Sequence, residues 1–197
     1  MSTHHIVRDK QEPALLLATP EACSFEQASQ LLEWSPVVMA LPEALPEALS
    51  WQIKLDIALL SSTSSISSSD LEFQQPIQIL QPSGNLLSFA LSHLAEKNHK
   101  AVNISLQAGS FAQSEEILST YAQKLDIVVY SQLWKQVFVR GGKFEKWLTE
   151  GSVLQFNATI TQTKNLRQLS DGQWQVLQNG IVAVTGSKSF WLAEMIA

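Results

Sequence analysis

The first 130 residues alternate short apolar runs with amphipathic stretches. Each apolar run is four to six residues long, which is the length of a buried strand. These runs are residues 14–19, 37–41, 57–60, 77–80, 101–106 and 126–130. Short apolar strands that alternate with amphipathic helices are typical of a parallel sheet covered on both faces. The pattern therefore predicts an α/β N-terminal domain with three layers, helix, sheet and helix.

The stretches between these runs have helical spacing. Ser24 is placed to cap a helix whose apolar face begins at Phe25, and Pro42 opens a second helix. Leu87, Leu91 and Leu94 repeat at the interval of a helix face. The predicted helices begin after residue 24 and then cover about residues 42–52, 85–97 and 113–123.

The pattern changes near residue 131, beyond which apolar and polar residues alternate singly. This alternation indicates half-buried strands, and Gly141-Gly142, Asp171-Gly172 and Asn179-Gly180 supply turn signals between them. The expected strands are residues 136–139, 153–161, 173–177 and 181–184. We therefore predict a small antiparallel β-sandwich, and we divide the chain into domains at residues 1–135 and 136–197.

One loop stands out by composition, because every residue from Ser61 to Ser69 except Ile66 is serine or threonine. It follows one predicted strand and precedes another, which favours an ordered or partly mobile βα loop over a flexible linker. Ligands of doubly wound sheets bind at the carboxyl ends of the strands. The loop is therefore a candidate binding segment.

Charge and cysteine content exclude several classes of function. The formal net charge is −5 with no basic stripe, which argues against nucleic-acid binding. One cysteine and four histidines leave no zinc-binding constellation. No apolar run approaches the ~20 residues that span a bilayer. We expect a cytoplasmic protein with no membrane segment and no bound metal.

Two residue types are scarce. Gly84 is the first of only eight glycines, so the first 83 residues hold no glycine-rich phosphate loop. There are five aspartates, and no acidic residue lies between Glu72 and Glu96. Magnesium, which requires carboxylate ligands, therefore has few side chains to bind.

Several segments spread over the chain resemble the bacterial thiamine pyrophosphokinases. They are residues 4–8 (HHIVR), 11–15 (QEPAL), 31–36 (LLEWSP), 101–103 (AVN) and 142–147 (GKFEKW). The resemblance implies an N-terminal α/β domain, a C-terminal β-sandwich and a homodimer with thiamine sites between subunits. It also implies transfer of a pyrophosphoryl group from ATP to thiamine, with magnesium held by clustered aspartates.

The acidic motifs of that family are not kept here. Lys54-Leu55-Asp56 matches the start of the first motif, but Ser61 and Thr63 stand where the family has aspartates. The other matching positions, also without the family's charged residues, are Ser83 and Leu86 in the second motif and Gln113 and Ser114 in the third. Neutral side chains at these positions do not bind Mg²⁺ tightly.

The C-terminal motif is partly kept. Gly186 and Ser187 resemble a turn that contributes to thiamine binding in the family, whereas Lys188 and Ser189 depart from its Ser-Asn. A thiamine-like ligand is therefore the small-molecule partner that the resemblance suggests.

Our leading hypothesis is a thiamine-pyrophosphokinase-like homodimer that has lost catalysis and serves in small-molecule binding, regulation or protein association. No cofactor is expected in that case. The alternative is an active enzyme that uses Mg²⁺ and ATP, with Asp56 and acids from Asp70, Glu72 or a partner chain as substitute ligands. A protein with an interaction role and no ligand pocket is the third possibility. Asp56 itself is better explained as a residue that caps a turn or pairs with a neighbour such as Lys54 than as a metal ligand.

Overall fold

The computed structural model describes residues 12–34, 36–62, 64–169 and 172–196. Their contacts divide the chain into two compact units that meet between Ile127 and Val128. The division at residues 135 and 136 stays a prediction. No helix in these residues is long and apolar enough to cross a membrane.

The first unit is built on a parallel sheet in the order β5-β1-β2-β3-β4, and every neighbouring pair runs in the same direction. Its strands are β1 (Ala14–Leu17), β2 (Val38–Ala40), β3 (Ile57–Leu59), β4 (Gln78–Leu80) and β5 (Ala101–Ser105). All five lie within or overlap the predicted apolar runs. The parallel sheet predicted from the sequence is therefore confirmed.

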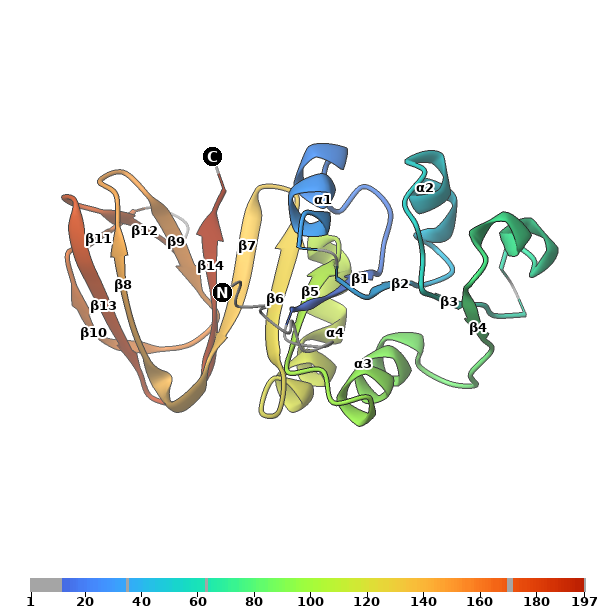
Figure 1. Cartoon of the computed structure of the whole chain (residues 1–197). Helices are drawn as coiled ribbons and strands as arrows, with labels where there is room; N and C mark the ends of the chain where they lie inside the picture. Colours follow the sequence, from blue (N-terminus) through green and yellow to red (C-terminus); the bar gives the residue numbers. More distant parts are fainter. Residues whose placement is uncertain (1–11, 35, 63, 170–171, 197) are drawn as a thin grey trace, which may run out of the picture. The chain divides into compact units, whose positions relative to one another are not determined.

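Helices cover both faces of this sheet. Helices α1 (Phe25–Leu32) and α2 (Leu45–Ser50) lie on one face, and α3 (Leu86–Glu96) and α4 (Ala108–Tyr121) lie on the other (Figure 1). A short 3₁₀ helix, η1 (Ser69–Gln74), precedes β4. The three-layer architecture is confirmed.

Side-chain capping explains where two helices begin. The Ser24 hydroxyl accepts from the Gln27 amide at 3.1 Å while the Gln27 side chain accepts from the Ser24 amide at 2.9 Å, a capping box. The Asn85 side chain accepts from the Ser88 amide and caps α3. Helix α4 begins at Ala108, five residues before the predicted start, and no side chain caps it.

The core of the first unit follows the two-residue period of its strands. Leu15, Leu17 and Ala40 belong to the cluster that packs under α1 and α2. Leu16 and Met39 point to the opposite face and are also fully buried. Strands buried on both faces read as continuous apolar runs, which is why the sequence revealed them so clearly.

The second unit consists of antiparallel strands in two sheets around one apolar cluster that includes Val139, Leu154, Val182 and Phe190. In one sheet the hydrogen-bonded order is β6 (Asp126–Ser131), β7 (Trp134–Val139), β14 (Phe190–Met195), β9 (Val153–Phe156), β12 (Gln173–Val176) and β11 (Leu166–Gln168). The other sheet consists of β10 (Ile160–Lys164), β13 (Gly180–Gly186) and β8 (Lys143–Leu148) in that order. The predicted β-sandwich is confirmed.

One predicted strand of this unit is wrong. Residues 153–161 were expected to form a single strand, but β9 ends at Phe156 and β10 begins at Ile160 in the other sheet. The chain therefore passes from one sheet to the other within the segment. Apolar alternation continues across this corner, so the pattern alone does not reveal it.

Candidate functional site

The topology of the first unit singles out one edge of its sheet. From β1 the chain builds outward through β2 and β3 to β4, and β5 then lies on the other side of β1. The connections that leave the carboxyl ends of β1 and β5 therefore diverge. A crevice opens at such a switch point, and ligands of open α/β sheets bind there.

Two cavities lie at this carboxyl edge. The first has a volume of about 330 Å³ and lies next to the segments that follow β1, β2 and β5. It is lined by Ala18, Thr19, Leu41, Pro42, Glu43, Gly84, Asn85, Leu86, Leu87, Leu106, Ser110, Gln113 and Ser114. The second, of about 500 Å³, lies beyond β2, β3 and β4 and is lined by Pro42, Glu43, Ser61, Ser62, Ser64, Ser65, Pro82, Ser83, Gly84 and Leu86. Because the cavities share four lining residues, we call the two together the edge recess.

Hydrogen bonds fix the wall of the recess at the switch point. The Gln107 amide donates to the Thr19 hydroxyl at 2.7 Å, and the Gln107 side chain donates to the Pro20 carbonyl at 2.9 Å. The amides of Ala18 and Thr19 both donate to the Ser105 carbonyl. The loop after β1 is therefore held against the junction of β5 and α4, which gives this wall a defined shape.

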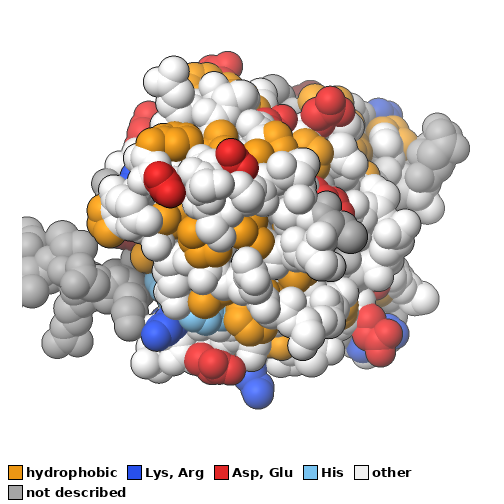
Figure 2. All heavy atoms as spheres, turned by 90° about the vertical axis from the view of Figure 1, so that its right-hand side faces the viewer, with side chains coloured by type: hydrophobic (Ala, Val, Ile, Leu, Met, Phe, Trp, Pro, Cys, Tyr) orange, Lys and Arg blue, Asp and Glu red, His pale blue; other side chains and the backbone are white. Residues whose placement is uncertain are grey.

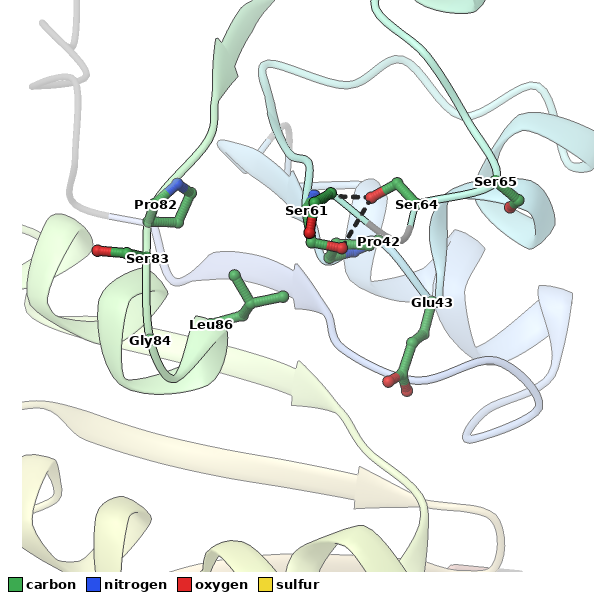
Figure 3. Close-up of a pocket in the computed structure, with 10 residues that line it drawn as sticks. Pro42, Glu43, Ser61, Ser64, Ser65, Pro82, Ser83, Gly84 and Leu86 are labelled. Atoms are coloured by element: carbon green, nitrogen blue, oxygen red, sulfur yellow. Dashed lines mark hydrogen bonds between the residues drawn. The ribbon is translucent and has the colours of Figure 1, made fainter.

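The serine-rich loop supplies another wall. The Ser61 amide donates to the Ser64 hydroxyl at 2.7 Å, and the Ser64 amide donates to the Ser61 carbonyl at 3.1 Å, which closes a turn directly after β3 (Figure 3). In the same view Pro82, Ser83 and Gly84 lie on the opposite side, and Leu86 projects from the start of α3 between the two walls. Ser61 and Ser64 are therefore held together at the edge where the sequence predicts a candidate binding segment.

The end of the loop does not face the recess. The Ser67 amide and hydroxyl donate to the Asp70 carboxylate at 2.8 and 2.6 Å, and these bonds lower the pKa of Asp70. Neither Asp70 nor Glu72 lines either cavity. The substitute metal ligands considered from the sequence are therefore not brought to this edge.

The structure brings most of the predicted site positions together. The recess is lined by Ser61, Ser83, Leu86, Gln113 and Ser114. Asp56 lies instead before β3, at the amino edge, where its carboxylate accepts from the Val38 amide at 2.8 Å. Thr63 falls outside the described residues.

Sequence reasoning missed Glu43 as a site residue. It directly follows the Leu41-Pro42 pair at the end of β2 and lines both cavities. Among the described lining residues it is the only one with a charged side chain. Its place just beyond an apolar strand was the available signal, but Pro42 and its neighbours also fit the start of a helix, which is the pattern that the sequence predicts there.

The residues present do not fit magnesium with a nucleoside triphosphate. No three His, Cys, Asp or Glu side chains of the described chain are grouped so that they could hold a metal ion. The recess has no described Lys, Arg or His in its lining to neutralise phosphate charge. On the face at the β4 end of the sheet, uncharged side chains predominate and the basic ones lie at the margins (Figure 2).

Gly186 and Ser187 lie in the second unit. A Cβ atom on Gly186 would come within 2.9 Å of the Phe190 ring, so packing alone requires glycine there. Ser187 is exposed just after β13, and its amide donates to the Thr159 carbonyl. The part of these two residues in ligand binding stays a prediction.

Comparison with solved structures identifies the fold. The chain superposes on thiamine pyrophosphokinase from Bacillus subtilis with a TM-score of 0.72 and 9% identity, covering 93% of this chain and 99% of that one. A probable thiamine pyrophosphokinase from Staphylococcus saprophyticus gives 0.66 and 15% identity over 94% and 99% of the two chains. The enzyme from Candida albicans gives 0.66 and 10% identity over 94% and 90%.

Sequence comparisons add nothing to this result, since no protein-family model and no curated protein matches the chain. Identities of this size establish the fold alone. The chain has the thiamine pyrophosphokinase fold, as the resemblance in its sequence predicts.

Proposed function

We propose that this protein, with the fold of a thiamine pyrophosphokinase, does not transfer pyrophosphate and instead acts by binding a small molecule, in a regulatory or carrier role. The observation that supports the proposal is the chemistry of the edge recess. Among the described residues, hydroxyl and amide side chains and one carboxylate, that of Glu43, form its polar lining. A thiamine-like compound is the first ligand to test.

The physical reason is electrostatic. Transfer of a pyrophosphoryl group develops negative charge on the phosphate oxygens and on the departing AMP, which divalent cations and basic side chains must neutralise. Serine hydroxyls do not supply that charge, and one carboxylate is a poor site for Mg²⁺. Removal of such groups costs ~10²–10³-fold in rate for a single donor, so removal of several abolishes useful catalysis.

The test combines binding and turnover. Isothermal titration calorimetry measures the affinity of the purified protein for thiamine and for ATP with Mg²⁺, and mass spectrometry detects thiamine pyrophosphate in the mixture. We expect no product. Heat from thiamine alone would support a binding role, whereas product that scales with protein concentration would overturn the proposal and establish the active alternative.

We also propose that the protein is a homodimer in the cytoplasm. Trp147 of β8 and Ile181 of β13 are direct cross-strand neighbours, and 58% and 46% of their surfaces are exposed. An exposed aromatic and aliphatic pair of this kind suits burial by a second subunit. Sedimentation velocity should give the mass of a dimer, and a monomer across the micromolar range would contradict this.

A further inference from the structure

Several polar side chains that line the edge recess form no hydrogen bond within the described part of the protein. Within the described residues, the side chains of Glu43, Ser83, Ser110, Gln113 and Ser114 have no hydrogen-bond or ion-pair partner. They come from the segments that follow β2 and β4 and from the first two turns of α4. Convergence of unused polar groups in a concave site is typical of a ligand pocket.

We propose that the edge recess binds a saturated, polyhydroxylated molecule that is uncharged or carries one positive charge, with Glu43 as the partner of that charge. This inference rests on the proposed function, because it requires that the recess does not hold a magnesium nucleotide. It extends that proposal by naming the class of ligand, and it replaces the thiamine-like compound, whose rings are flat and aromatic, as the ligand expected in the recess.

The hydroxyl groups of the ligand are inferred from the polar side chains that line the edge recess. Serine and glutamine side chains each donate and accept hydrogen bonds, as a ligand hydroxyl also does. The Thr19 hydroxyl accepts from the Gln107 amide and, among the described residues, donates to none, so its proton is available to a ligand. A ligand with several hydroxyls satisfies these groups at different positions around the recess.

The positive charge of the ligand is inferred from the carboxylate of Glu43. A phosphate or carboxylate on the ligand would meet this carboxylate with no described basic side chain in the lining to offset the repulsion. An ammonium group would instead form a charge-assisted hydrogen bond with it. The recess should therefore prefer amines to their neutral analogues and should reject phosphate esters.

The saturated character is inferred from the apolar part of the lining. It consists of Pro42, Pro82, Leu86 and other aliphatic residues, with no Phe, Tyr, Trp or His among the described ones. A nucleobase or another flat ring would have no aromatic surface on which to stack. The apolar edges of a sugar-like ring are matched by these aliphatic side chains.

The test is a matched set of three probes, glucosamine, glucose and glucosamine 6-phosphate. Titration calorimetry at slightly acidic pH keeps the amine protonated. We expect glucosamine to bind about tenfold more tightly than glucose, the size of one charge-assisted hydrogen bond, and glucosamine 6-phosphate to bind most weakly. Glu43→Gln should lower the glucosamine affinity to that of glucose and leave glucose binding unchanged.

Glu33→Gln is the control, since Glu33 is an exposed carboxylate that does not line the recess. It should change none of the three affinities. Tighter binding of glucosamine 6-phosphate than of glucosamine, equal effects of the two variants, or no binding of any probe at millimolar concentration would each overturn the inference. The assay for thiamine pyrophosphate distinguishes failure of the proposed function from failure of this inference. Formation of that product would refute the proposal that the protein is inactive, whereas the three sugar affinities test only the class of ligand.

Discussion

The two edges of the parallel sheet use their polar side chains in opposite ways. At the amino edge the Gln74 amide group, 4% exposed, accepts from the Leu55 amide at 3.0 Å and donates to the Ile53 carbonyl at 3.1 Å. Asp56 accepts from the Val38 amide, and Lys54 donates to the Pro76 carbonyl at 3.1 Å. These side chains complete backbone hydrogen bonds.

At the carboxyl edge the side chains of Glu43, Ser83 and Gln113 have no such partners within the described chain. Thr19 and Gln107 also stabilise the fold at the carboxyl edge, but other polar groups there remain available, whereas the three at the amino edge are used. The residue type of a polar side chain does not show whether it stabilises the fold or is free to bind a ligand. Its hydrogen-bond partners within the protein do. Variants at the two edges should therefore differ in stability.

The largest effect is expected from Gln74→Leu. Loss of the side-chain amide leaves the Leu55 amide and the Ile53 carbonyl buried without partners, at a cost of about 3 kcal/mol in the free energy of unfolding. Urea denaturation followed by circular dichroism measures the change. Gln113→Leu is the matched control at the other edge, where a loss within about 0.5 kcal/mol is expected. Equal losses of stability in Gln74→Leu and Gln113→Leu would contradict the proposed difference between the two edges of the sheet.

A smaller difference is expected between two acidic residues. Asp56→Ala removes the acceptor of the Val38 amide and should cost about 1–2 kcal/mol of stability. Glu43→Ala should leave the urea midpoint nearly unchanged, since no described residue pairs with Glu43. A greater loss from Glu43→Ala than from Asp56→Ala would show that Glu43 has a structural role.

A pH effect is expected from His93, in the last turn of α3. Its Nε2 atom is buried with no hydrogen-bond partner in the described chain, and burial, with a smaller effect of Lys97, lowers the His93 pKa from its ordinary value of 6.5. The unfolded chain therefore binds the proton more readily than the native protein does. This contribution to stability is present above pH 6.5 and is lost as the pH falls through the native pKa.

His93→Leu should accordingly flatten the dependence of the urea midpoint on pH below that value. Lys97→Gln, which keeps the imidazole, serves as the control and should retain most of the slope. A wild-type midpoint that rises on acidification through this window, with the rise absent from His93→Leu, would reverse the sign and refute the assignment.

The smallest effect concerns Cys23, a buried residue of the loop between β1 and α1. Burial raises the pKa of the Cys23 thiol, and the Ser105 hydroxyl donates to its sulfur at 3.3 Å. We expect iodoacetamide to modify the native protein slowly and the urea-unfolded protein quickly, as read by mass spectrometry. Fast modification of the native thiol would mean that the wall beside the recess opens.

Much of the fold could be predicted from the sequence because buried parallel strands are marked by apolar runs. Residues 57–60 contain β3, and the predicted helix at 85–97 contains α3. The start of α4 was missed because Gly109 and Ser110 are weak helix formers and Gln107 supplies no side-chain cap. The 3₁₀ helix at Ser69–Gln74 was missed because its residues continue the polar composition of the loop.

The site could be predicted less completely. Ser61 and Ser83 were found because they match motif positions of the family that the sequence resembles, and they line the recess because they follow β3 and β4 at the carboxyl edge that parallel strands share. Asp56 was kept as a possible ligand because it matches a motif, although its position before β3 puts it at the amino edge. Which polar side chains remain unpaired depends on the folded neighbours, and no sequence pattern contains that information.

The central claim is that the carboxyl edge of this sheet does not hold a magnesium nucleotide. Calorimetric titration of the wild-type protein with ATP and Mg²⁺, with a competent thiamine pyrophosphokinase as the positive control, tests it most directly. The account predicts no saturable heat for this protein up to millimolar nucleotide. Saturable binding that disappears when the metal is chelated would contradict the account.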